Sequence, residues 1–198
     1  MRNFNIIPLA LIISLVSIGS TGLFTANILG SSEAATVTWK TFNDRNGLFT
    51  IEYPSNWIPT KVAEPLGPGP IDVAFWYYGK DDTFAYIEVY ADLDSIYADS
   101  RTMMEAEQAW SESTSEDYRL EQGVECAKYI INGARACSMI DSFTMPDEDQ
   151  RRNVLYANAV NNSGIEYRFT LSSSEDIFEH FRPVFDHMVR SFRLTGIL

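Results

Sequence analysis

The two histidines of the chain, His180 and His187, lie in one segment near the C-terminus. They are seven residues apart, which is nearly two helical turns, so a helix places both on one face. The same spacing separates them by about 10 Å along the helix axis, too far for one ion to bind both rings of a straight helix. Asp176 precedes His180 by four residues, and this pair supplies half of a metal site. These three residues are the candidate metal ligands, and solvated charge pairing is the alternative.

Acidic residues cluster at four places, each in an expected loop or at an expected helix start. Loop carboxylates are ligands for hard cations such as Ca²⁺, but none of these clusters has the spacing of an EF-hand loop. We therefore expect no dedicated cofactor and, at most, weak calcium binding where two loops meet. A solvated acidic surface is the alternative. The clusters are Asp81-Asp82, Asp92-x-Asp94, Asp147-Glu148-Asp149 and Glu175-Asp176.

The common catalytic motifs are missing from the sequence. There is no G-x-S-x-G elbow, phosphate-binding loop, dinucleotide fingerprint or H-E-x-x-H. The sequence therefore predicts a protein that is not an enzyme and leaves catalytic residues unassigned. The alternative is a metal-dependent enzyme that uses Asp176, His180 and nearby acids.

The only two cysteines, Cys126 and Cys137, flank Asn132-Gly133, a dipeptide typical of a two-residue hairpin turn. A regular hairpin places Cys126 opposite Met139 and diagonal to Cys137, whereas a slightly different loop places the cysteines directly opposite each other. In an oxidising compartment such a pair is usually a disulfide. We predict a Cys126–Cys137 disulfide, with two buried free thiols as the alternative.

The N-terminal segment has the features of an export signal. No charged residue occurs between Asn3 and Ser32, and Ile6–Ile18 forms an apolar run. Cleavage after Ala34 or Ala35 is one interpretation, and a retained membrane anchor is the other. Both predict an exported protein, secreted or membrane-anchored, with residues 1–35 as signal or anchor and residues 36–198 as one domain. The sequon Asn161-Asn162-Ser163 agrees with export and makes Asn161 a candidate glycosylation site.

Composition and charge narrow the class of protein. The 198 residues are 45% hydrophobic and 13% aromatic, which indicates one packed domain. The 15 Lys and Arg residues against 27 Asp and Glu residues give a net charge of −12, and an acidic surface repels phosphate backbones. We therefore expect no nucleic-acid partner.

Period-two alternation of apolar residues predicts a domain that is mostly sheet, with hairpin signals that favour antiparallel pairing. The proline-rich segment 59–70 is an expected surface loop. In the run Phe75-Trp76-Tyr77-Tyr78, alternate aromatic residues must face away from the core. The predicted strands are 37–42, 48–53, 72–78, 84–91, 118–122, 124–131, 135–143, 153–160 and 165–171.

Two helices interrupt the predicted strands. The first starts near Asp99 or Ser100 and carries Met103, Ala106 and Trp110 at helical spacing, so we expect this side to pack on the sheet. The second covers residues 174–192, with a kink or a late start at Pro183. Its broad apolar stripe consists of Ile177, Phe178, Phe181, Val184, Phe185, Met188, Val189 and Phe192.

The segment Gly47-Leu48-Phe49-Thr50-Ile51-Glu52-Tyr53-Pro54-Ser55-Asn56-Trp57 resembles the opening signature of PsbP-like domains. The aromatic run at 73–78, the central helix, the Asn-Gly hairpin and the helical ending 185–192 extend the resemblance over nearly all of residues 37–194. The resemblance implies an α+β fold, in which a single antiparallel β-sheet is flanked by helices as an α/β/α sandwich. Members of this family include an extrinsic photosystem II subunit, and the chain looks like a prokaryotic, non-photosynthetic relative.

The resemblance implies a non-catalytic extracytoplasmic accessory or binding module, associated with a membrane protein complex. An uncharacterised metal-dependent enzyme and a stand-alone ligand-binding domain, whose outward aromatic residues line a groove, are the alternatives. The sequence leaves the oligomeric state undetermined.

Overall fold

A computed structural model describes residues 37–44, 48–61, 71–80, 83–144 and 150–195. The predicted export segment and the acidic clusters at 81–82 and 147–149 lie outside these ranges. The strands are β1 (Trp39–Asn43), β2 (Phe49–Pro54), β3 (Ile58–Lys61), β4 (Ile71–Tyr78), β5 (Phe84–Asp92), β6 (Glu116–Glu125), β7 (Ile130–Ile131), β8 (Ala134–Arg135), β9 (Cys137–Thr144), β10 (Arg151–Val160), β11 (Glu166–Ser174) and β12 (Arg193–Leu194). The helices are α1 (Ser100–Thr114) and α2 (Glu175–Ser191).

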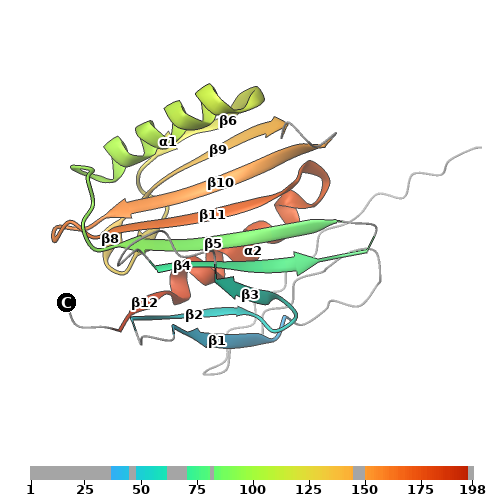
Figure 1. Cartoon of the computed structure of the whole chain (residues 1–198), viewed down its shortest axis with the longest axis horizontal. Coiled ribbons are helices and arrows are strands. Elements are labelled where there is room, and N and C mark those ends of the chain that lie inside the picture. The colour runs from blue at the N-terminus through green and yellow to red at the C-terminus, as the bar shows by residue number, and fades with distance from the viewer. Residues whose placement is uncertain (1–36, 45–47, 62–70, 81–82, 145–149, 196–198) are drawn as a thin grey trace, which may run out of the picture.

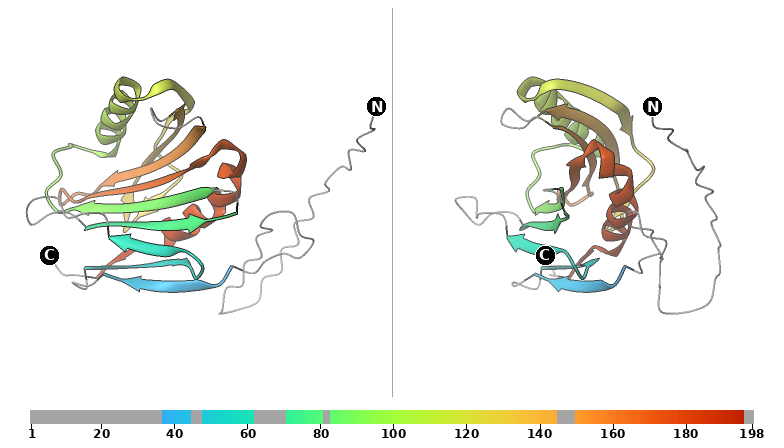
Figure 2. Two further views of the ribbon diagram at one scale, coloured as in Figure 1. Left: turned by 45° about the vertical axis from the view of Figure 1, so that its right-hand side comes forward. Right: turned by 90° about the vertical axis from the view of Figure 1, so that its right-hand side faces the viewer.

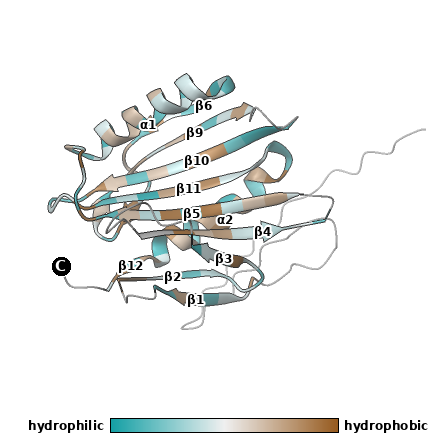
Figure 3. Cartoon of the chain, in the orientation of Figure 1, coloured by the Kyte–Doolittle hydropathy of each residue, from teal (hydrophilic) through white to brown (hydrophobic). Residues whose placement is uncertain are grey.

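The main sheet has seven strands in the order β3-β4-β5-β11-β10-β9-β6, and all of its neighbours are antiparallel (Figure 1). Buried and more exposed residues alternate along β5 and along most of β11, as the pleat of a sheet requires (Figure 3). One edge strand, β3, is four residues long and contains Pro59. The other edge strand, β6, carries charged exposed side chains and shifts its register against β9 three times.

The two helices cover opposite faces of the main sheet, as an α/β/α sandwich requires (Figure 2). All eight residues of the predicted apolar stripe are buried, seven of them within α2 and Phe192 directly after it, so that prediction is confirmed. It is continuous from Glu175 to Ser191 with Pro183 inside it, so the helix does not start after a turn at the proline. The predicted α+β class is therefore confirmed, with smaller sheets added to the main one.

A three-stranded sheet, in the order β1-β2-β12, packs beside α2. Trp57 is buried against Phe181 of α2, with ring centroids 5.4 Å apart. The sequence analysis did not predict β3 or β12, because each is too short to show periodicity. The rest of the expected loop 59–70, residues 62–70, lies outside the described residues.

Helix α1 starts where the sequence predicts, because the Asp99 side chain accepts a hydrogen bond from the amide of Thr102. The expected packing of Trp110 is wrong, since its side chain is 62% exposed. Met103 is buried as predicted, and the buried side of α1 also carries Met104 and Ser111. Helix α1 therefore contacts the sheet through a narrow row of buried side chains that includes Ser111. Trp110 lies outside this row, so its side chain stays at the surface.

The Asn132-Gly133 turn joins β7 to β8, and both residues have positive φ angles, as a type I′ turn requires. The predicted strand 124–131 is wrong, because the chain leaves the sheet after Glu125 and only Ile130–Ile131 returns to pair. Glu125 pairs with Ser138, so Cys126 and Cys137 lie directly opposite each other. They form the predicted disulfide.

Candidate functional site

The face of the main sheet that carries α1 is only partly covered. Helix α1 packs on β6, β9 and β10, whereas β4 and β5 have no helix in front of them (Figure 1). Strand alternation determines which side chains point to this face. Phe75 is fully buried toward α2, and the outward direction expected for its neighbours Trp76 and Tyr78 is confirmed, since these two rings stack with each other.

Four aromatic side chains form a patch on this open face, which we call the aromatic patch: Trp76, Tyr78, Phe84 and Tyr86. The Trp76 ring lies 4.8 Å from that of Tyr86 and 6.3 Å from that of Phe84. Tyr78 is 65% exposed. Large aromatic surfaces at the protein exterior are typical of binding sites, because their burial by a partner releases water from apolar area.

A groove of about 650 Å³ separates α1 from this face of the sheet, and we call it the α1 groove. Its volume is in the range of ligand pockets. Aromatic rings, carboxyl groups and one guanidinium line it. The lining residues are Tyr86, Glu88, Tyr90, Glu107, Trp110, Thr114, Ser115, Phe143, Thr144, Val154, Tyr156, Arg168 and Thr170.

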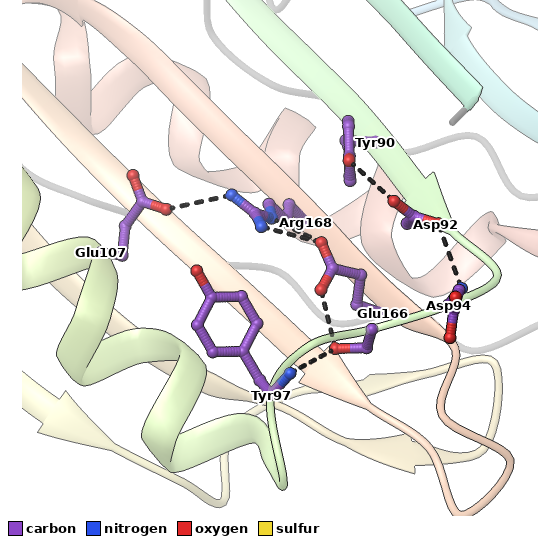
Figure 4. A network of polar contacts seen from close by, with 8 residues as sticks. Tyr90, Asp92, Asp94, Tyr97, Glu107, Glu166 and Arg168 are labelled. Carbon is purple, nitrogen blue, oxygen red and sulfur yellow. Dashed lines mark hydrogen bonds and ion pairs between the residues drawn. The ribbon is translucent and has the colours of Figure 1, made fainter. Parts of the chain in front are cut away.

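Arg168 of β11 is held in a fixed position at the floor of the groove (Figure 4). Its Nε and Nη2 donate to Oε1 of the buried Glu166 at 3.1 and 2.8 Å. Its Nη1 lies 3.6 Å from Oε2 of Glu107 on α1. The guanidinium also lies 5.1 Å from the centre of the Tyr90 ring. Arg168 therefore connects the helix to the sheet across the groove.

Burial raises the pKa of two groups beside Arg168. The pKa of Glu107 is raised mainly by desolvation, and the charge of Glu166 adds to this, although Arg168 opposes it. The pKa of Tyr90 is raised to about 12 by desolvation and by the neighbouring Asp92. The Tyr90 hydroxyl donates to Oδ2 of Asp92 at 3.2 Å, while Oδ1 of Asp92 accepts from the amide of Asp94. The Asp92-x-Asp94 cluster is thus engaged in local hydrogen bonds.

Asp141 of β9 lies beneath α1, beside a residue that lines the groove. It is fully buried, and its cross-strand neighbour Val154 lines the groove. Among the described residues, neither of its carboxyl oxygens has a partner in hydrogen-bonding geometry, although Ser111 is near enough to lower its pKa. The pKa of Asp141 is nevertheless raised to about 7, mainly by desolvation and also by the charge of Glu107.

The sequence-predicted metal ligands have separate surroundings. The Asp176 carboxylate accepts from the Ser174 hydroxyl at 2.6 Å at the start of α2. The His180 ring packs on Phe181, and burial lowers its pKa. Nε2 of His187 lies 2.7 Å from Oε2 of Glu52. In the part of the chain that the structure describes, no three His, Cys, Asp or Glu residues are grouped to hold a metal ion.

His187 connects the small sheet to α2. Its ring stacks on Trp39 of β1 with centroids 3.7 Å apart, and its imidazole contacts Glu52 of β2. Asn161, the candidate glycosylation site, accepts from the amides of Ser163 and Ile165 in the β10–β11 loop. These contacts give both residues structural roles, and they leave metal binding and glycosylation as predictions.

The sequence analysis missed three residues of the site: Glu107, Asp141 and Arg168. Two of them had a detectable signal, because Asp141 and Arg168 are charged residues within predicted strands that are otherwise mostly apolar. Glu107 had none, since a glutamate on a surface helix is ordinary.

Neither described helix is both long and apolar enough to cross a bilayer.

No family model and no curated protein matches the sequence. Solved structures do match. Cyanobacterial PsbP (CyanoP) from Synechocystis sp. PCC 6803 aligns with a TM-score of 0.53 and 17% identity, over 84% of this chain and 98% of that chain. The Ran-binding protein Mog1p of Saccharomyces cerevisiae aligns with a TM-score of 0.58 and 11% identity, over 81% of this chain and 97% of that chain.

Both alignments extend over nearly the whole of the compared proteins, so the likeness concerns a complete domain. Identities this low establish the arrangement of helices and strands and leave the activity open. The chain therefore has the Mog1/PsbP-like fold. This confirms the fold expected from the resemblance of residues 47–57 to PsbP-like domains.

Proposed function

We propose that the protein is an exported, non-catalytic binding or accessory module, and that it contacts its partner with the aromatic patch and the α1 groove. The single observation that carries this proposal is the open sheet face, where exposed aromatic rings adjoin a groove with a fixed Arg168. Recognition needs a preorganised surface of this kind. A membrane protein complex is the partner class implied by the PsbP-like resemblance.

Export is supported by two independent features. The Cys126–Cys137 disulfide is typical of proteins that fold in an oxidising compartment. The uncharged segment between Asn3 and Ser32 is typical of an export signal or anchor. The proposed module therefore acts outside the cytoplasm, either secreted or held at the membrane.

Site-specific photo-crosslinking in the native cells tests the proposal. A photoreactive residue at Tyr78 or Trp110 lies on the proposed binding face, whereas one at Glu179 lies on the exposed side of α2. We expect one discrete adduct from the first two positions and none from Glu179. Adducts from Glu179 alone, or no adduct at any position, would contradict the proposed binding face.

A further inference from the structure

The disulfide lies in a second cleft, at the end of the main sheet where α1 begins. This cleft has a volume of about 930 Å³, and both Cys126 and Cys137 line it. The loop before α1, the β7–β8 turn and the β10–β11 loop form its other walls. Cys126 is partly exposed, whereas Cys137 is only 2% exposed. A thiol reagent in the cleft therefore reaches the bridge from the side of Cys126.

The charged residues that line this cleft are mostly positive, although the chain has a net charge of −12. They are Arg101, Arg135 and Asp99. Within the described part of the chain, Arg135 has no ion-pair partner, and Arg101 makes only a long contact of 3.9 Å with the exposed Glu105. The Asp99 carboxylate accepts hydrogen bonds from the amide and the hydroxyl of Thr102. Positive charge beside a cysteine favours its thiolate, which is the reactive form.

Other charged residues close to the cleft leave this balance unchanged. Glu125 and Lys128 lie near Cys126 in the sequence with opposite charges, and neither lines the cleft. The Glu166 carboxylate, which accepts from the hydroxyl of the loop before α1, is neutralised by Arg168 at 2.8 Å. The surroundings of the bridge are therefore positive on the side of the cleft.

The first turn of α1 is fixed beside Cys137. The Ser100 hydroxyl donates to the carbonyl oxygen of Arg135 at 2.8 Å and accepts from the amide of Val160 at 3.0 Å. Arg135 lies two residues before Cys137, and Val160 lies two residues after Asn158, which pairs with Cys137. A helix begins with a partial positive charge, which adds to that of Arg135. Burial of Cys137 opposes its ionisation, so these positive groups are what make it a leaving thiolate.

The segment between the two cysteines is held by contacts other than the bridge. The Tyr129 hydroxyl donates to Oδ1 of Asp186 on α2 at 2.7 Å, and the amide of Ala136 donates to the carbonyl oxygen of Tyr129 at 3.0 Å. Nδ2 of Asn132 donates to the Tyr167 hydroxyl at 3.1 Å. Reduction of the bridge therefore leaves both thiols close together, and the bond can form again.

We propose that the Cys126–Cys137 bridge is a reversible redox site that exchanges with a dithiol of a partner protein. A thiolate of the dithiol attacks Sγ of Cys126, the bond between Cys126 and Cys137 breaks, and Cys137 leaves as a thiolate. The second thiol of the dithiol then attacks the mixed disulfide and releases Cys126. Two electrons and two protons pass to this chain, so the dithiol is oxidised to a disulfide while Cys126 and Cys137 become thiols. This site needs neither the aromatic patch nor the α1 groove.

Reduction of the native full-length chain by dithiothreitol tests the proposal. We expect a rate proportional to the dithiothreitol concentration, because the reagent attacks a bridge that is accessible in the folded protein. The circular dichroism spectrum should stay unchanged on reduction, and glutathione disulfide should restore the bridge. A rate that becomes independent of the reagent concentration, or loss of the folded spectrum on reduction, would overturn the proposal, because the bridge would then be a sealed structural link.

A matched pair of variants separates the cleft from the general charge of the protein. Arg135→Gln should slow the reduction at least about threefold, because it removes positive charge from beside the attacking and leaving thiolates. Arg119→Gln removes the same charge from an exposed position of β6 outside the cleft, and it should change the rate by less than about 1.5-fold. Equal changes in the two variants would overturn the proposal, because the rate would then follow net charge alone.

The ionisation of Cys137 gives a second readout. In Cys126→Ser the ultraviolet absorbance of the thiolate, measured against pH, reports Cys137 alone. This thiolate should form at a lower pH than in the double variant that combines Cys126→Ser with Arg135→Gln. Coinciding titration curves would show that the cleft does not stabilise the leaving thiolate, and they would overturn the proposed exchange.

Discussion

Asp141 combines full burial and a raised pKa with carboxyl oxygens that have no hydrogen-bond partner in the described part of the chain. Such a group weakens a fold when it is ionised, because burial removes the water that stabilises its charge. A buried polar residue of this kind is often retained for binding or catalysis rather than for stability. Because it lies beneath α1, we expect its ionisation to weaken the packing of that helix.

Because of the titration of Asp141, the stability of the protein should fall as the pH rises from about 4 to about 7. The pKa of Asp141 rises from 3.8 to about 7 on folding, so in this range the unfolded chain loses its proton while the folded chain keeps it. The total effect is a few kcal/mol at most, since each unit of pKa shift contributes about 1.4 kcal/mol. Denaturation by urea across this pH range measures it.

Asp141→Asn is the control for this prediction, because the amide does not titrate. We expect the variant to lose most of the decrease between pH values of about 4 and 7. Parallel stability profiles for the wild type and the variant would show that other groups cause the pH dependence.

His187 should be the most sensitive of the predicted ligand positions. His187→Ala removes the stack on Trp39 and the contact with Glu52, and we expect a loss of about 1–3 kcal/mol in the free energy of unfolding. Arg190→Ala, on the exposed side of the same helix, should have an effect below about 0.5 kcal/mol. Similar losses in the two variants would mean that the His187 contacts contribute little.

At the scale of elements, the turn between β7 and β8 depends on one glycine. Gly133 has a φ of +84°, and nothing lies within 4 Å of a Cβ placed there, so only the backbone conformation opposes a larger residue. Gly133→Ala should therefore cost about 1 kcal/mol. The loss appears as a lower midpoint of thermal unfolding.

Gly123 is a matched control for this substitution. It lies in β6, has equally open space around its Cβ position and lacks a positive φ. Gly123→Ala should leave stability unchanged or raise it slightly, because it reduces the freedom of the unfolded chain. A loss at Gly123 equal to that at Gly133 would contradict the role of φ.

Elements with strong local patterns could be predicted from the sequence. The stripe of α2, the cap at Asp99 and the Asn132-Gly133 turn are encoded by residues close in the chain, and all three are confirmed. Trp110 was placed wrongly because the buried side of α1 contains few apolar residues, so periodicity alone selected the wrong side. The shape of β6 also could not be predicted, since its register shifts depend on β9.

The candidate site was only partly predictable for a related reason. Strand alternation alone predicts that alternate residues of the run at 75–78 face outward, and the structure identifies Trp76 and Tyr78 as these residues. The contact between Glu107 and Arg168 instead requires α1 to cross the sheet at one particular place, and 61 positions separate the two residues in the sequence. Distances of this kind are determined by packing, which a local pattern does not specify.

At the scale of the whole molecule, the disulfide reports the compartment in which the protein folds. In protein made by export, Cys126 and Cys137 should resist alkylation until a reductant is added, as intact mass shows. The bridge closes a loop with a sequence separation of 11, so its reduction should cost about 2.5–3 kcal/mol at most. Two thiols that react freely in native exported protein would contradict the disulfide.

The two edges of the main sheet limit how the protein can associate. Sheet edges invite pairing with another chain, but β3 offers only four residues with a proline among them, and β6 is irregular and charged. Polymerisation by strand addition to the main sheet is therefore disfavoured. If the proposed binding face is right, a partner binds through side chains across it, and specificity then depends on a few surface residues that can change without altering the fold.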